Sequence, residues 1–316
     1  MVNHRYTKAV GFTGSFQGGK ALFNWANQRK EPIPVFAEMG SINPVFLLPG
    51  KLKEDPTSVA KNYAASITLG VGQFCTNPGL IIGLEGDDLQ KFTTELGIAM
   101  GEVSPGKMLH DDIAKNYSAN KALALSQHGV EVIISKAADD NSIQGDPALA
   151  SVDAETFVNN PLLHQEVFGP YSLIVRCRNE NEMLTVAQHL EGQLTATLMA
   201  TDEDIRSNGI LVEFIKNICG RLLMNGVPTG VEVCLSMQHG GPFPASTDSR
   251  FTSVGADAMK RFIRPLAFQN WSAELLPEEL KNENPLGIWR TVNNKFTRLP
   301  RSEEHTSELQ SQNRIS

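Results

Sequence analysis

Short, uninterrupted apolar runs recur along this chain and alternate with segments in which apolar residues have helical spacing. The clearest runs are 43–48, 80–84 and 171–177. A strand that is apolar on both sides is typical of a parallel sheet covered by helices on both faces. The alternation of such strands with helices therefore predicts an α/β fold.

The same patterns give the expected elements. We expect strands at 6–12, 35–37, 43–48, 80–84, 130–135, 147–157, 171–177, 194–200 and 221–225. We expect helices at 57–69, 87–100, 111–127, 179–190, 203–217 and 256–263. A further helix follows Gly19, with Leu22, Trp25 and Ala26 on one apolar face.

Charge and hydropathy exclude several classes of protein. The net charge of −7 argues against an electrostatic nucleic-acid binder. No stretch of about 18 apolar residues is present, and the first residues lack the apolar core of a signal peptide. We expect a cytoplasmic protein that binds neither nucleic acid nor membrane.

The thiols and imidazoles are dispersed in the sequence. Cys75, Cys177, Cys219 and Cys234 form no CxxC pair, which indicates a reducing compartment. The seven histidines make no HExxH motif and no Cys/His cluster, so we expect no metal site. Cys177, Cys219 and Cys234 are interpreted as structural thiols, with Cys219 at the end of a helix.

Cys75 and Glu38 are the residues with the clearest chemistry. Cys75 lies in a loop that Gly72 and Gly79 flank, and Glu38 ends a short strand. A thiolate can attack a carbonyl carbon, and a carboxylate can then activate water against the resulting thioester. The pair by itself is weak evidence, because most single cysteines are inert core residues.

A glycine turn near the start suggests an anion site. The segment Gly11–Ser15 leaves a strand and opens a helix. Backbone N–H groups at a helix N-terminus favour a phosphate, although a simple tight turn has the same sequence pattern.

Four short strings follow one another along the chain: Phe12-Thr13-Gly14-Ser15, Glu38-Met39-Gly40, Phe74-Cys75-Thr76 and Glu166-Val167-Phe168-Gly169-Pro170. In this order and spacing the chain resembles the NAD(P)-dependent aldehyde dehydrogenase superfamily, over Val2 to Pro300. Four longer strings are Ala37–Pro44, Phe74–Leu80, His239-Gly240-Gly241-Pro242-Phe243-Pro244 and Asn284–Arg290. They resemble the α-ketoglutaric semialdehyde (2,5-dioxopentanoate) dehydrogenases. Fatty-aldehyde dehydrogenases share part of this pattern.

The resemblance implies a role for each matching residue. Cys75 matches the nucleophile, whose own N–H is expected to meet the oxyanion, and Glu38 matches the general base. The expected NAD or NADP contacts are Gly14, Ser15, Gly19, Met39, Glu166 and Phe168. Glu166 is expected to hold the nicotinamide ribose. The substrate is expected to be a small keto- or carboxy-aldehyde, 2,5-dioxopentanoate, which is oxidised to 2-oxoglutarate through a thiohemiacetal and a thioester. The full-length protein is expected to be a homo-oligomer.

The two ends of the chain look unlike those of a complete domain. We expect 1–40 to be a remnant of an NAD(P)-binding domain, 41–268 a catalytic domain and 269–300 a C-terminal segment. Residues 301–316 resemble a translated sequencing adapter and are expected to make no ordered contacts. The family's upstream cofactor and oxyanion residues have no match here, so we expect this chain alone to be poorly soluble and inactive.

Four alternatives remain open at this point. The chain could oxidise a fatty or other aldehyde, or it could be an inactive fragment. A cysteine hydrolase would need a histidine beside Cys75, and nothing near the histidines in the sequence supports one. A CoA-acylating enzyme is disfavoured because Glu38 would activate water.

Overall fold

The computed structural model describes residues 1–135 and 143–301. The chain divides into two compact units, Met1–Phe262 and Ile263–Ser316, which are described separately. The domain boundaries expected from the sequence remain predictions.

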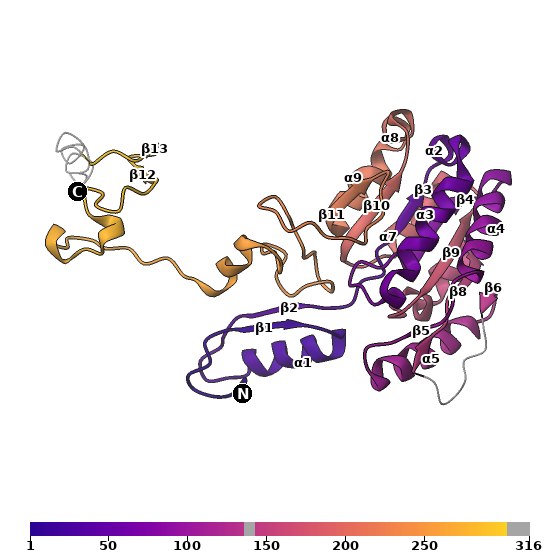
Figure 1. Ribbon diagram of the computed structural model, residues 1–316, viewed down its shortest axis with the longest axis horizontal. Helices are drawn as coiled ribbons and strands as arrows, with labels where there is room; N and C mark the ends of the chain where they lie inside the picture. The colour runs from indigo at the N-terminus through magenta and orange to yellow at the C-terminus, as the bar shows by residue number, and fades with distance from the viewer. Residues whose placement is uncertain (136–142, 302–316) are drawn as a thin grey trace. The chain divides into compact units, whose positions relative to one another are not determined.

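The first unit is built on a seven-stranded sheet (Figure 1). Its strands are β3 (Val45–Leu47), β4 (Leu80–Leu84), β6 (Glu131–Ser135), β8 (Ala148–Asp153), β9 (Tyr171–Cys177), β10 (Gln193–Met199) and β11 (Cys219–Met224). Their order is β11-β10-β3-β4-β9-β8-β6, and all neighbours are parallel except β6 and β8. This arrangement confirms the predicted α/β fold.

Helices cover both faces of this sheet. They are α2 (Pro49–Glu54), α3 (Pro56–Thr68), α4 (Asp87–Gly101), α5 (Asp111–Leu125), α6 (Ala154–Asn159), α7 (Glu180–Gln188), α8 (Asp202–Ser207) and α9 (Gly209–Ile218). Short 3-10 helices lie at η1 (Leu69–Gly72), η2 (Pro161–His164) and η3 (Ala256–Phe262).

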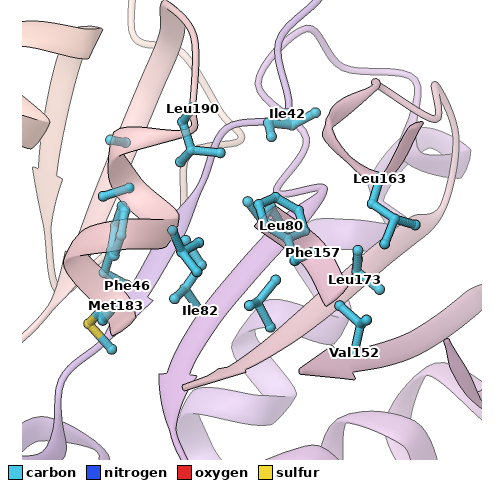
Figure 2. Packing of buried hydrophobic residues seen from close by; sticks show 14 of the residues in the cluster. Ile42, Phe46, Leu80, Ile82, Val152, Phe157, Leu163, Leu173, Met183 and Leu190 are labelled. Atoms are coloured by element: carbon cyan, nitrogen blue, oxygen red, sulfur yellow. The ribbon is translucent and has the colours of Figure 1, made fainter. Parts of the chain in front are cut away.

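Adjacent strand residues enter two different apolar clusters. Phe46 and Ile82 pack with Met183 of α7 (Figure 2), whereas Val45 and Ile81 pack in the cluster that contains residues of α3 and α4. Successive side chains of a strand point to opposite faces, so both faces of the sheet are core. The continuous apolar runs in the sequence have this cause.

A second, smaller parallel pair comprises β1 (Val10–Thr13) and β2 (Val35–Glu38), joined by α1 (Phe16–Asn27). Ser15 caps α1, since its side chain accepts a hydrogen bond from the Gly18 backbone N–H. The prediction for Trp25 is wrong: its side chain is 53% exposed, whereas Ala26 is fully buried. The helix packs on only two strands, so its buried stripe is narrow.

Three expected elements differ from the prediction. The strand expected at 147–157 ends at Asp153, whose side chain accepts from the Thr156 backbone N–H at 2.8 Å and starts α6. The helix expected at 203–217 breaks at Asn208 into α8 and α9. The segment 256–263 forms the 3-10 helix η3 rather than an α-helix, and none of its residues is fully buried. Local capping and a shortage of buried contacts outweighed periodicity at these places. A short antiparallel pair, β5 (Gly106–Lys107) with β7 (Gln144–Gly145), was not predicted.

The second unit has little regular structure. It contains η4 (Ala273–Leu275), η5 (Glu278–Leu280) and an antiparallel hairpin of β12 (Arg290–Val292) and β13 (Lys295–Thr297). The Arg301 backbone N–H donates to the Asn282 carbonyl at 2.8 Å, so the expected lack of ordered contacts is wrong for Arg301. The rest of the adapter-like stretch, 302–316, lies outside the described residues.

Candidate active site

Cys75 lies in the loop between η1 and β4, and its side chain is partly buried. The chain enters this loop through Gly70 and Gly72, which have φ angles of 54° and 65°. Glycine adopts these left-handed angles without strain. A Cβ on Gly72 would also overlap the backbone of Gly169, so the loop is pressed against the segment that precedes β9.

Asn43 holds the Cys75 loop in place through hydrogen bonds from its side chain. Its side-chain amide donates to the carbonyls of Cys75 (3.0 Å) and Asn77 (2.9 Å), and its Oδ1 accepts from Thr195 Oγ1 at 3.0 Å. Asn43 is 1% exposed and has a φ of 49°, a region that asparagine tolerates better than most residues. Gln193 Oε1 in turn accepts from the Asn43 backbone N–H at 3.1 Å. Buried, fully bonded polar groups of this kind hold the Cys75 backbone in one position.

Glu38 ends β2 and is almost completely buried, at 4% exposure. Its backbone carbonyl accepts from the Gly14 N–H at 3.1 Å, which links it to the glycine turn. One carboxylate oxygen lies 3.2 Å from His239 Nε2, and the other accepts from the Ser253 hydroxyl. The structure therefore places Glu38 beside a buried histidine.

His239 Nε2 also lies 3.1 Å from Cys75 Sγ. The expectation that no histidine stands near the thiol is therefore wrong: a buried imidazole lies within reach of both Cys75 and Glu38. The three residues are far apart in sequence, so their meeting was visible only in the fold. The one available signal was the string His239-Gly240-Gly241. It is part of the family resemblance, which implied no role for the histidine.

Glycines bring the His239 loop close to the sheet. A Cβ on Gly220 would overlap the Gly240 carbonyl, and a Cβ on Gly241 would overlap the Gln193 carbonyl. The backbone of His239 is fixed further by bonds to Thr252 Oγ1 (2.9 Å) and from the Ser253 N–H (2.7 Å). The His239 loop can approach the sheet this closely only because Gly220 and Gly241 have no side chains where the backbones touch.

The surroundings of His239 and Glu38 shift the pKa values of these two residues. Burial lowers the pKa of His239, but hydrogen bonds to Cys75 and Glu38 and their charges outweigh it and raise the pKa to about 9. Burial raises the pKa of Glu38, but the hydrogen bond and charge of His239, with further bonds from Ser253 and Cys75, bring it below the ordinary value. A protonated His239 and an ionised Glu38 at neutral pH follow.

The expected cofactor residues at the N-terminal end lie near this cluster. Gly14 and Ser15 are exposed at the start of α1, where Ser15 serves as the N-cap. Gly19 packs against Met39, since a Cβ there would lie 2.6 Å from Met39 Cγ. Met39 is buried and directly follows Glu38.

Glu166 and Phe168 line one cavity together with Ser41 and Asn77. The Glu166 carboxylate lies against Gly40, where a Cβ would approach Oε2 to 2.6 Å. Burial raises the pKa of Glu166 to about 7, although a hydrogen bond from the Ser41 backbone N–H lowers it in part. The structure thus brings Glu166 next to the segment that carries Glu38.

The other thiols have different surroundings. All four cysteines are free. Burial raises the pKa of Cys177 to about 12 and of Cys219 to about 11. Cys219 begins β11 rather than ending a helix, and Cys234 is exposed. Low reactivity is expected of Cys177 and Cys219, because a thiol with a high pKa has little thiolate.

The sequence pattern shows no Cys/His cluster, but the fold brings a cysteine and a histidine together with Glu38. The expected absence of a metal site stays a prediction. Ligand atoms of Glu38, Cys75 and His239 all lie within 4.8 Å of one another.

No helix within 1–135 or 143–301 combines the length and the apolarity needed to cross a membrane.

Known proteins resemble the chain over most of its length. An α-ketoglutaric semialdehyde dehydrogenase 2 of Azospirillum brasilense is 47% identical over 295 residues, which cover 93% of this chain and 56% of that protein. An α-ketoglutaric semialdehyde dehydrogenase of Acinetobacter baylyi is 44% identical, over 94% of this chain and 57% of its own length. The chain therefore spans a little more than half the length of these relatives.

Solved structures share the fold at lower identity. A γ-glutamyl-γ-aminobutyraldehyde dehydrogenase from Burkholderia cenocepacia matches with a TM-score of 0.68 and 17% identity, over 82% of this chain and 52% of that one. A succinic semialdehyde dehydrogenase from Streptococcus pyogenes, solved with NADP+, matches with a TM-score of 0.63 and 20% identity, over 78% and 52%. The sequence pattern of the aldehyde dehydrogenase family matches residues 1–242. With this match and the shared fold, the chain belongs to the aldehyde dehydrogenase family.

Proposed function

We propose that the protein carrying this chain oxidises a short aldehyde that bears a carboxylate, 2,5-dioxopentanoate, to 2-oxoglutarate. The observation that supports the chemistry is the group formed by Cys75, His239 and Glu38, with distances of 3.1 and 3.2 Å. The substrate is the one for which the relatives at 44–47% identity are named. Because the chain spans about half of those relatives, the activity is assigned to the whole protein.

In the first step Cys75 attacks the aldehyde carbon and forms a thiohemiacetal. A protonated His239, 3.1 Å from the sulfur, stabilises the thiolate that attacks. The Asn43 amide donates to the Cys75 carbonyl at 3.0 Å and so fixes the Cys75 backbone. The sulfur and the Cys75 N–H, which meets the developing oxyanion, then keep one direction.

In the second step Glu38 acts on water. The thiohemiacetal loses a hydride and becomes a thioester on Cys75. The ionised Glu38 then takes a proton from a water molecule, whose oxygen attacks the thioester carbon, and the Cys75 thiolate leaves. The bonds from His239 and Ser253 keep Glu38 ionised and oriented for this role.

Aldehyde dehydrogenases use NAD(P)+, which supplies the hydride acceptor when bound. The residues present fit part of such a group. The exposed turn at Gly14 and Ser15 precedes α1, where backbone N–H groups suit a phosphate. Glu166, half-buried in a cavity that Phe168 also lines, offers a carboxyl group for ribose hydroxyls.

Arg221 favours an anionic substrate over a fatty aldehyde. It lies on β11 in register with Thr195, and its charge interacts with Cys75. Its Nη2 donates to the Pro228 carbonyl at 2.8 Å, but its buried Nε finds no partner among the described residues. A half-buried guanidinium with spare hydrogen-bonding capacity suits a carboxylate.

The test uses this chain and any longer protein that carries it. Reduction of NAD+ and NADP+ is followed with 2,5-dioxopentanoate and with hexanal, an uncharged aldehyde of similar length. Arg221→Leu is expected to raise KM for 2,5-dioxopentanoate at least tenfold and to leave KM for hexanal unchanged, while Cys75→Ala abolishes both reactions. Faster oxidation of hexanal than of 2,5-dioxopentanoate by the unaltered protein would contradict the proposed substrate.

A further inference from the structure

We propose that Glu38, Cys75 and His239 form a site for a single Zn²⁺ ion, which binds reversibly and blocks the thiol. The sulfur, imidazole nitrogen and carboxylate oxygen lie within 4.8 Å of one another. Sulfur, nitrogen and oxygen from Cys, His and Glu are the ligands that protein zinc sites use. Three protein ligands with a fourth position left for water are typical of a zinc site that remains open to solvent.

Two of the three ligand separations fit zinc with small side-chain movements. Bond lengths of about 2.3 Å to sulfur and about 2.0–2.2 Å to nitrogen and oxygen, at tetrahedral angles, put S and N about 3.5 Å apart and N and O about 3.4 Å apart. The structure has 3.1 Å between Cys75 Sγ and His239 Nε2, and 3.2 Å between His239 Nε2 and Glu38 Oε1. These two pairs need an expansion of a few tenths of an ångström, and the sulfur and the carboxylate oxygen, which lie within 4.8 Å of each other, need a separation of about 3.6 Å.

The charges of the site also suit a divalent cation. A buried ion is tolerated only when opposite charges compensate it. The thiolate of Cys75 and the carboxylate of Glu38 together carry two negative charges, and His239 coordinates as a neutral imidazole. Zinc takes the place of the protons that join these groups, and the displaced protons leave to solvent. Because Glu38 and His239 are buried, the ion reaches the site from the side of the partly buried Cys75.

The consequence for activity rests on the proposed function. Zinc occupies the sulfur lone pair that attacks the aldehyde and the carboxylate that activates water, so a loaded site is inactive. It also shields the thiol from alkylation and oxidation. Removal of the ion by a chelator restores the free thiol, so the state is reversible.

Zinc binding is measured on the untagged chain without an activity assay. Equilibrium dialysis against Zn²⁺ is expected to leave one ion per chain, and EDTA is expected to remove it. Iodoacetamide labelling, mapped by mass spectrometry, is expected to slow at least tenfold at Cys75 when zinc is present. The exposed Cys234 in the same molecule is the internal control and is expected to keep its labelling rate. Cobalt(II) in place of zinc is expected to give a thiolate-to-metal charge-transfer band.

Variants identify the ligands. Cys75→Ser, His239→Gln and Glu38→Gln are each expected to weaken zinc binding at least about tenfold, since even changes in groups that only orient ligands cost about that much. Cys234→Ser and His128→Gln alter exposed residues elsewhere and are expected to bind zinc as the parent chain does. Circular dichroism checks the fold of each variant.

Some outcomes overturn the inference. They are the absence of bound zinc in the parent chain, equal slowing at Cys75 and Cys234, or undiminished binding in all three ligand variants. The labelling result on the parent chain stands even where a variant does not fold. Zinc binding without aldehyde oxidation by the longer protein that carries this chain would refute the proposed function alone. Oxidation that Cys75 carries out without zinc binding would refute this inference alone.

Discussion

Asn43→Asp is predicted to destabilise the fold strongly although it changes a single atom of the side chain. The amide of Asn43 donates to three carbonyls, those of Ser41 (3.2 Å), Cys75 (3.0 Å) and Asn77 (2.9 Å). Aspartate keeps the acceptor that binds Thr195 but turns the donor into a carboxylate oxygen that faces three carbonyl oxygens. Each buried carbonyl left without its donor costs about 1–3 kcal/mol. The amide has two N–H protons for these three bonds, so two donors are lost. Taking the lower half of that range for each, we expect a loss of about 2–4 kcal/mol.

Asn225→Asp is the matched control. Asn225 also has a positive φ, of 55°, and its amide donates to a single carbonyl, that of Ala200, at 2.8 Å. The same chemical change should therefore cost about 1 kcal/mol there. Both variants share the backbone conformation and the added charge, but Asn225 is exposed whereas Asn43 is buried. The difference between them therefore reports the lost donors together with the burial of Asn43.

The assay is urea denaturation followed by circular dichroism. The free energies of unfolding are compared with the same dependence on urea concentration for both variants. A second readout is the rate of Cys75 alkylation relative to Cys234, which should change in Asn43→Asp because the loop loses its anchor, and stay unchanged in Asn225→Asp. If Asn43→Asp lost no more stability than Asn225→Asp, the view that Asn43 holds the Cys75 loop would be refuted.

Three further changes test other parts of the site. Glu38→Gln should leave a first burst of reduced cofactor and slow the following turnover by about 10²–10⁴-fold, because hydrolysis loses its base; unchanged steady-state turnover would assign the water to another group. The pKa of Glu166 is about 7 in the fold against 4.5 as its ordinary value, so the native state binds the extra proton and its stability falls as pH rises from 4.5 through 7. Glu166→Gln should therefore gain up to about 3 kcal/mol relative to the parent chain between pH 4.5 and 8, at about 1.4 kcal/mol per unit; a stability difference that does not vary with pH would contradict the burial of Glu166. Gly220→Ala should push the Gly240 carbonyl away and lower thiol reactivity at Cys75, whereas Gly226→Ala, which meets no atom closer than 4.0 Å, should not; equal reactivity of Cys75 in both variants would show that Gly220 does not position the histidine loop.

The fold class followed from the sequence because it depends on local patterns. Runs such as Leu80–Leu84 are apolar throughout, and such a run fits a strand buried on both faces. The prediction failed where local bonding ended an element, as when Asp153 capped a helix inside an expected strand. It also failed at Trp25, where helical spacing gave the correct face but not its width.

The sequence by itself determined the α/β class, the positions of most strands, and two candidate groups, Cys75 and Glu38, each recognisable from its own neighbours. Only the tertiary structure decided that His239 completes the site. That histidine stands in a loop after the last strand of the large sheet, and its approach depends on glycines at Gly220 and Gly241 that let two backbones touch. Sequence patterns report what a residue does within its own helix, strand or turn. The distance between a thiol, a carboxylate and an imidazole from three separate segments is set by packing, and only the folded chain contains that information.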